Sequence, residues 1–220
     1  MKQSVIITAG GIGKRMNSDL PKQYIPVNGL PILMHTINKF HEFNSDIQIV
    51  ISLPKDFVQL WKDLCQKHKF KVLHEITEGG AERYHSIKNA LKKVTGDIVM
   101  VHDAVRPLVS LQTISNVINQ AGVKGAAIPV LPVKDTLRKG SVEKSQHQDR
   151  SEFWIVQTPQ AFKLELLNEA YQIPYSSAVT DDASLVEALG AQVFLTEGNE
   201  ENIKITTPFD LKLVEFLMEK

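Results

Sequence analysis

The sequence predicts an α/β fold in which helices cover both faces of a mostly parallel β-sheet. Short runs rich in Val and Ile alternate along the chain with segments whose apolar residues recur at helical spacing. Most of these runs lack alternating polar residues, which is typical of strands buried on both faces. Alternating strands and helices form right-handed crossover units. Together these observations predict a three-layer α/β/α sandwich of the Rossmann-like kind.

Strands and helices alternate through the first half of the chain. The expected strands are Ser4–Ala9, Ile47–Ser52, Lys71–His74, Ile98–His102 and Gly125–Pro129. The expected helices are Pro31–Phe43, Phe57–His68, Glu82–Lys93 and Leu111–Gln120. Pro31 and Pro54 stand where helices can begin, because the first helical turn tolerates proline.

The segment from Lys134 to Arg150 interrupts this pattern. It is polar, has little apolar content, and contains the turn signal Gly140-Ser141. One interpretation is a solvated hairpin, and the other is a β-arm that projects onto a neighbouring subunit. The residues alone leave both open. We call residues 134–150 the arm.

After the arm the α/β character resumes. The expected elements are a strand at Phe153–Gln157, helices at Lys163–Gln172 and Thr180–Leu189, and strands at Gln192–Thr196 and Ile203–Ile205. A last helix should begin after Thr207, with Pro208 at its first position and Asp210 in its first turn. Because no linker divides the chain, we expect residues 1–220 to form a single domain from which the arm projects.

Composition limits the possible functions. Lys plus Arg number 25 and Asp plus Glu number 25, so no overall charge favours nucleic acid or an anionic membrane. The single Cys65 excludes an intramolecular disulfide and a cysteine-rich zinc site. No apolar stretch approaches the roughly 20 residues that span a bilayer, and the N-terminus lacks a signal-peptide pattern. We therefore expect a cytoplasmic protein.

A glycine-rich loop follows the first expected strand. Three glycines occur within the four residues 10–13, and Lys14, Arg15 and Lys22 follow them. Glycines let backbone N–H groups approach an anion closely, and nearby cations favour a polyphosphate. A Walker A loop would need Ser or Thr after Lys14, where Arg15 stands, and a dinucleotide fingerprint would need glycine at Met16. Both common nucleotide-binding patterns therefore fail.

The pattern G-G-x-G-x-R-M followed by P-K-Q resembles nucleotidyltransferases that make nucleotide-diphosphate alcohols and sugars. Further matching segments occur in order at Glu78–Ser86, Val101–Pro107, Val133–Leu137, Asp149-Arg150, Gln157–Phe162, Thr180–Ser184 and Asn202–Pro208. Over nearly its whole length the chain resembles the 2-C-methyl-D-erythritol 4-phosphate cytidylyltransferase family. The resemblance implies the nucleotide-diphospho-sugar transferase type of fold.

The resemblance also implies a reaction. CTP and a polyol phosphate would give a CDP-alcohol and pyrophosphate, a step of the non-mevalonate isoprenoid pathway. Mg²⁺ would be bound mainly through the CTP phosphates, and no protein metal ligand is expected. The arm would join two subunits in a homodimer, so that each active site is shared.

Site residues follow from the matching motifs. The resemblance implies catalytic roles for Arg15, Lys22 and Lys204. The implied nucleotide-binding residues are Ala9, Gly10, Gly11, Ile12, Gly13, Lys14, Gly80, Ser86 and Asp103. The implied polyol-phosphate-binding residues are Asp103, Arg106, Thr136, Arg150 and Thr158. Ala81 stands where the family commonly has Asp, so it receives no role.

Alternatives remain. Ribitol-5-phosphate cytidylyltransferase shares several motifs, although Val133–Leu137, Trp154–Phe162 and Thr180–Ser184 fit the erythritol family better. A glycosyltransferase on the same kind of sheet would need a D-x-D motif, which the chain lacks. A non-catalytic nucleotide-binding regulator would not need the three cations. Taken singly, Arg15 and Lys22 could be ordinary surface residues. Asp103 and Arg106 of H-D-A-V-R-P could form a purely structural salt bridge.

Overall fold

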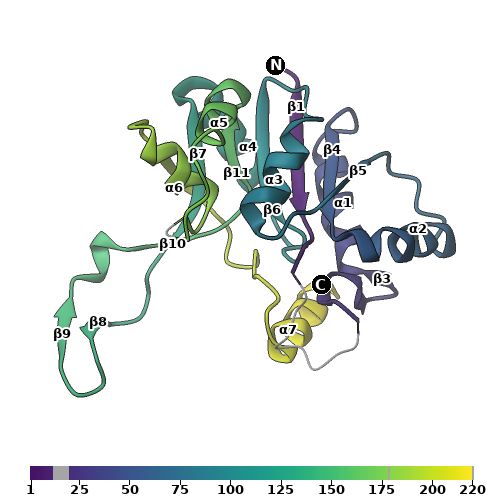
Figure 1. Ribbon diagram of the computed structural model, residues 1–220. Coiled ribbons are helices and arrows are strands. Elements are labelled where there is room, and N and C mark those ends of the chain that lie inside the picture. The colour runs from purple at the N-terminus through teal and green to yellow at the C-terminus, as the bar shows by residue number, and fades with distance from the viewer. Residues whose placement is uncertain (12–19, 178, 220) are drawn as a thin grey trace.

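The computed structural model describes residues 1–11, 20–177 and 179–219 of the chain. Within them an eight-stranded sheet forms the centre of the molecule (Figure 1). Its strands are β1 (Gln3–Thr8), β4 (Gln48–Leu53), β5 (Glu75–Glu78), β6 (Ile98–Asp103), β7 (Ala126–Pro132), β10 (Trp154–Val156), β11 (Gln160–Lys163) and β12 (Phe194–Glu197).

Most neighbouring strands run parallel. β1 lies between β4 and β6, β5 extends the sheet beyond β4, and β12 pairs with β7, all in parallel. β11 lies antiparallel between β6 and β7, and β10 continues along β7 in the same antiparallel sense. The predicted α/β class with a mostly parallel sheet is confirmed.

Helices cover both faces of the sheet. They are α1 (Ile32–Phe43), α2 (Val58–Lys67), α3 (Arg83–Leu91), α4 (Leu111–Lys124), α5 (Leu164–Ala170) and α6 (Asp182–Ala188). The last helix, α7 (Pro208–Met218), packs instead in a separate cluster that contains Val105, just beyond the end of β6. Val5 and Ile7 of β1 pack in the core formed with α1, α2 and α4, whereas Ile6 packs in the core formed with α3, α5 and α6. The alternation of side chains along a strand therefore supplies two hydrophobic cores from one apolar run.

Two predicted strands are wrong. Residues 71–74 are irregular, and Leu73 is 89% exposed; the strand begins only at Glu75, where pairing with β4 starts. Residues 203–205 are also irregular, although the Ile205 N–H donates to the Val105 carbonyl. Side chains bind one carbonyl of this segment and one just before it: Lys22 donates to the Ile205 carbonyl and Arg106 to the Asn202 carbonyl. Short apolar runs do not reveal whether a neighbouring strand will pair with them.

One strand of the central sheet was missed, as were the two-residue strands β2 (Pro26–Val27) and β3 (Leu30–Pro31), which pair only with each other. Residues 160–163 form β11, which inserts between two strands far away in sequence. The prediction began a helix at Lys163, whereas α5 begins at Leu164, and the preceding Thr158–Pro159 peptide bond is cis. The strand is four residues long and follows a proline, so periodicity gives it little signal.

The arm is a hairpin of β8 (Leu137–Gly140) and β9 (Ser145–Gln148), paired antiparallel. Figure 1 shows that it projects away from the central sheet. Most of its side chains are exposed. The predicted contact with a second subunit stays a prediction.

The last helix begins as predicted. The Thr207 side chain accepts a hydrogen bond from the Asp210 N–H, and the Asp210 carboxylate accepts from the Thr206 and Thr207 N–H groups. This capping arrangement fixes the chain just before α7. We call residues 202–207, which lead into this helix, the 202–207 segment. Among the described helices, none has the length and apolar character needed to cross a lipid bilayer.

Candidate active site

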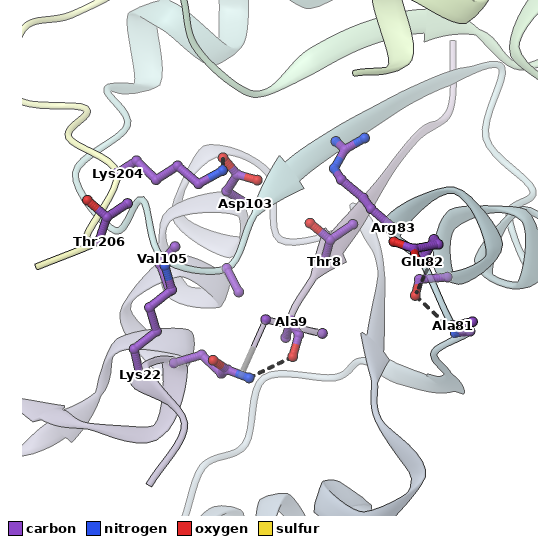
Figure 2. Close-up of a pocket in the computed structure, with 16 residues that line it drawn as sticks. Thr8, Ala9, Lys22, Ala81, Glu82, Arg83, Asp103, Val105, Lys204 and Thr206 are labelled. Carbon is purple, nitrogen blue, oxygen red and sulfur yellow. Dashed lines mark hydrogen bonds and ion pairs between the residues drawn. The ribbon is translucent and has the colours of Figure 1, made fainter. Parts of the chain in front are cut away.

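A cavity of about 470 Å³ opens at the carboxyl edge of the sheet, where β1, β4 and β6 end. Figure 2 shows the side chains that converge on it. They come from the end of β1, the turn before α3, the end of β6 and the 202–207 segment. The lining residues are Thr8–Gly11, Lys22, Gln23, Gly80–Arg83, Ser86, Asp103–Val105, Lys204 and Thr206. Ligands bind at this edge of parallel sheets because the loops that follow the strands meet there.

Asp103, the last residue of β6, is the charged centre of the cavity wall. Its Oδ2 accepts hydrogen bonds or ion pairs from Arg106 Nε at 3.0 Å and Lys204 Nζ at 3.1 Å. Burial alone would raise the pKa of Asp103, but the positive charges of Lys204, Arg106 and Arg83 outweigh it and hold the pKa well below its usual range. Asp103 is therefore an anion at any physiological pH.

Arg106 and Thr158 lie behind this wall. Arg106 is bound to Asp103 and, through Nη1, to the Asn202 carbonyl at 2.8 Å. Thr158 Oγ1 lies 3.0 Å from His102 Nδ1 and accepts from the Asp103 N–H at 3.1 Å. Neither residue is among those that line the cavity. Both are placed to hold Asp103, and their predicted contact with a polyol phosphate remains a prediction.

His102 is fully buried beneath Asp103. Burial lowers the pKa of His102 to about 4, so the ring is neutral near pH 7. Its Nε2 lies 3.1 Å from the Arg106 carbonyl, which can only accept. The proton therefore sits on Nε2, Nδ1 is an acceptor, and the Thr158 hydroxyl donates to it.

Lys22 connects the two ends of the chain at the cavity. Its Nζ donates to the Ile205 carbonyl at 2.8 Å, across 183 residues of sequence. The next residue, Gln23, is buried and donates through Nε2 to the Ala9 carbonyl at 2.7 Å. These contacts bring Lys22 and Lys204 to one cavity, as Figure 2 shows.

The turn before α3 forms the opposite wall. The Gly80 N–H donates to Ser86 Oγ at 3.0 Å, and Ser86 Oγ donates to the Glu82 carbonyl. A side chain at Gly80 would put its Cβ 2.2 Å from His85 Cβ, so this close approach requires glycine. The turn therefore presents backbone groups to the cavity.

Apart from Arg106 and Thr158, which lie behind the cavity wall, the predicted site residues fall into three groups. Ala9, Gly10, Gly11, Gly80, Ser86, Asp103, Lys22 and Lys204 line the cavity. Thr136 and Arg150 are exposed on the arm, where Arg150 donates to the Lys134 carbonyl, and neither lines the cavity of its own subunit. Ile12, Gly13, Lys14 and Arg15 lie outside the described residues.

Eight of the described residues that line the cavity were not predicted as site residues. Among them, Gln23, Arg83 and Thr206 each sit within a recognised motif: P-K-Q, G-G-A-E-R or I-T-T-P. Arg83 is bound to Asp182, 99 residues further along the chain. Their place within these motifs was the sequence signal that could have indicated a role. Only the fold shows which of their side chains face the cavity.

Comparison with known proteins gives the family. The family model for 2-C-methyl-D-erythritol 4-phosphate cytidylyltransferase matches residues 3–220. The chain belongs to this family. A cytidylyltransferase of this name from Phocaeicola vulgatus is 49% identical over 99% of this chain and 100% of its own. The enzyme of this name from Bacteroides thetaiotaomicron is 50% identical over the same shares. The crystal structure of the Thermus thermophilus enzyme aligns over 100% of both chains, with a TM-score of 0.82 and 35% identity.

The cytidylyltransferase family accounts for the sequence motifs that meet at the cavity. The described part of the chain holds no group of three or more His, Cys, Asp and Glu side chains that could bind a metal ion. Asp103, the acidic residue at the end of β6, already faces two cations.

The neutral His102 makes stability depend on pH. The pKa of His102 is near 4 in the fold and ordinarily about 6.5, so the unfolded chain binds the extra proton between these values. This contribution is complete above about pH 6.5 and is lost as the pH falls towards 4. We predict that lowering the pH from 7 to 5 removes about 2 kcal/mol through this residue.

Urea unfolding of the wild type and of His102→Gln at both pH values tests this. Glutamine keeps an N–H donor but does not titrate. The difference in free energy of unfolding between pH 7 and pH 5 should be smaller in the variant, while the other histidines contribute equally to both proteins. An equal pH dependence would contradict a buried, neutral His102.

Proposed function

We propose that this chain transfers the CMP group of CTP to 2-C-methyl-D-erythritol 4-phosphate, giving 4-diphosphocytidyl-2-C-methyl-D-erythritol and pyrophosphate in the non-mevalonate isoprenoid pathway. The observation that carries the proposal is the convergence of Lys22, Lys204 and an ionised Asp103 on one cavity, in a chain that belongs to this enzyme family. CTP is an intracellular metabolite, and we place the enzyme in the cytoplasm on that ground.

The reaction is an in-line displacement. A phosphate oxygen of the polyol phosphate attacks the α-phosphorus of CTP, the bond from that phosphorus to the α,β-bridging oxygen breaks, and pyrophosphate leaves. Such transfers need alignment of the two substrates and neutralisation of charge rather than covalent help. The protein's task is to place cations around the α-phosphate and the leaving group.

Lys22 and Lys204 are the described cations for this task. A pair of unit charges 4 Å apart is worth about 4 kcal/mol at an effective dielectric near 20. Two or three such contacts supply a useful share of the roughly 8–23 kcal/mol by which enzymes lower barriers. Arg15, carried over from the family, is proposed as the next cation, with the backbone of residues 10–14 around the β- and γ-phosphates.

Magnesium fits this site as a partner of the nucleotide. The donor set around the cavity is rich in cations and short of free carboxylates, which suits an ion held mainly by phosphate oxygens. When bound, Mg²⁺ neutralises charge on the triphosphate. Asp103 holds Lys204 at the cavity.

Base recognition falls to the turn before α3. Telling cytosine from uracil needs an acceptor aimed at the exocyclic amine, and backbone carbonyls at Ala9 and Gly80 are proposed for this. The Ala9 carbonyl already accepts from Gln23, which fixes its direction and leaves it a second lone pair. Ala81 contributes no polar side chain, so recognition relies on backbone there.

The arm is proposed to complete the site of a second subunit. Thr136 and Arg150 are exposed and do not line the cavity of their own subunit, yet arginine suits a phosphate through paired hydrogen bonds. At the base of the arm the apolar residues 153–156 are each 41–51% exposed. A row of exposed apolar side chains beside a projecting hairpin supports a homodimer through this face.

Ribitol 5-phosphate is the alternative acceptor, but the relatives named above are all methylerythritol phosphate enzymes. The deciding experiment measures pyrophosphate release from CTP and Mg²⁺ with each polyol phosphate supplied separately. Release with methylerythritol phosphate alone is expected. Release only with ribitol phosphate would favour the alternative, and release with neither would exclude a transferase of either kind.

Removing a cation should slow turnover. Lys22→Ala, and likewise Arg15→Ala, is predicted to lower kcat by roughly 10²–10³, as expected for the loss of one transition-state donor. Lys62→Ala on α2 is the matched control, because its exposed side chain does not line the cavity. Initial rates of pyrophosphate release measure the effect. A loss below about tenfold, or 1.4 kcal/mol, would mean that the residue is outside the charge clamp.

Mixed dimers test the shared site. Lys22→Ala and Arg150→Ala homodimers should both be slow, the second chiefly through a higher KM for the polyol phosphate. If arms cross, a dimer with one subunit of each kind holds one intact site of two, so purified mixed dimers should have about half of the wild-type activity. Differently tagged subunits, co-expressed and purified as pairs, allow the measurement. No restoration in isolated mixed dimers would show that each arm serves its own subunit.

A further inference from the structure

Arg83, the first residue of α3, is held rigidly at the cavity. Its Nη2 donates to Asp182 Oδ2 at 2.6 Å, and the Asp182 side chain is fully buried. The other carboxylate oxygen of Asp182 accepts from the Tyr171 hydroxyl at 2.6 Å. The bond to a buried carboxylate whose other oxygen is also bonded restrains the guanidinium before a ligand arrives.

The rest of this guanidinium is open to a ligand. Its bond to Asp182 uses Nη2, and across the described residues Nε and Nη1 have no protein acceptor. The side chain is 33% exposed and lines the cavity. A guanidinium has five N–H donors in a fixed plane, so donors remain for an oxygen-rich ligand.

Arg83 lies across the cavity from Asp103. Figure 2 shows Arg83 beside Glu82 and Asp103 beside Lys204, with Thr8 between the two sides. The electrostatics agree: although burial opposes the charge of Arg83, Asp182 and then Asp103 raise its pKa, and Arg83 in turn helps to lower the pKa of Asp103. A donor and an acceptor therefore flank the same space.

The group that fits between them is a vicinal diol. A hydroxyl donates its hydrogen to a carboxylate and accepts a hydrogen bond from a guanidinium, so a diol satisfies both partners. Arg83 directly follows the turn proposed to hold the base, and Ser86 lies one helical turn later. The part of a nucleotide joined directly to the base is the ribose. We infer that Arg83 is a ribose-binding residue that donates to a hydroxyl oxygen of the nucleotide, and that Asp182 is its positioning residue.

This inference rests on the proposed function and explains a motif that the function left unused. Within T-D-D-A-S, Asp181 caps α6 by accepting from the Ser184 N–H, whereas Asp182 extends to Arg83. The two acidic residues therefore do different work. The first begins a helix, and the second ties that helix to the nucleotide.

Calorimetric binding of CTP, 2′-deoxy-CTP and 3′-deoxy-CTP to the wild type and to Arg83→Met tests the inference without requiring turnover. We expect the wild type to bind CTP at least about fivefold more tightly than one of the deoxy analogues. Arg83→Met should weaken CTP binding by about that factor and bind that analogue as the wild type does. A uniform loss for all three nucleotides, or no loss, would overturn a ribose contact.

Control variants separate contact from folding. Lys92→Met removes a positive charge at the exposed end of the same helix and should leave all three affinities unchanged. Because Arg83→Met alone leaves the Asp182 carboxylate buried without its cation, Arg83→Met with Asp182→Asn is measured as well. It should show the same loss of discrimination. Asp182→Asn alone keeps the guanidinium of Arg83 and should lose only part of the discrimination between CTP and the deoxy analogue. Wild-type binding of CTP without transfer to either polyol phosphate would defeat the proposed function and leave this inference standing.

Discussion

One buried carboxylate organises the carboxyl edge of the sheet. Asp103 ends β6 and binds Arg106 in the following turn and Lys204 in the 202–207 segment. Breaking the largely buried Asp103–Arg106 pair costs roughly 3–5 kcal/mol, because the remaining charge loses its partner in a low-dielectric setting, whereas solvent screens the pair with the half-exposed Lys204. The ion pairs thus tie the end of a central strand to a segment that reaches the cavity from the other end of the chain.

The neighbouring polar groups serve the same constraint. The neutral ring of His102 and the Thr158 hydroxyl hold the backbone of Asp103 from beneath, and Arg106 bridges it to the Asn202 carbonyl. Arg106 and Thr158, which the family resemblance assigns to substrate binding, are therefore bound to other protein groups in this fold. They affect ligand binding by holding Asp103 and, through it, Lys204 in place. Arg106 of the H-D-A-V-R-P motif can therefore stabilise the fold and still influence substrate binding.

Local pattern and motif order predicted much of the molecule. The apolar run of β1 and the helical spacing that follows it gave the correct layers, because burial on two faces leaves a clear signature. Residues 71–74 and 203–205 were wrongly predicted to be strands. Strand formation depends on pairing with a neighbouring strand, which a short apolar run does not specify. The direction of Arg83 was also beyond the sequence, because its partner lies 99 residues away.

Replacement of Asp103 by asparagine tests the central claim most directly. Hydrogen exchange of the 202–207 segment and calorimetric binding of CTP are measured on the same folded variant. With the charge gone, Lys204 loses its anchor, so exchange in the segment should accelerate and CTP binding should weaken, while exchange in β1 and β4 stays slow. Unchanged protection of the segment with unchanged CTP affinity would contradict the view that Asp103 organises the site.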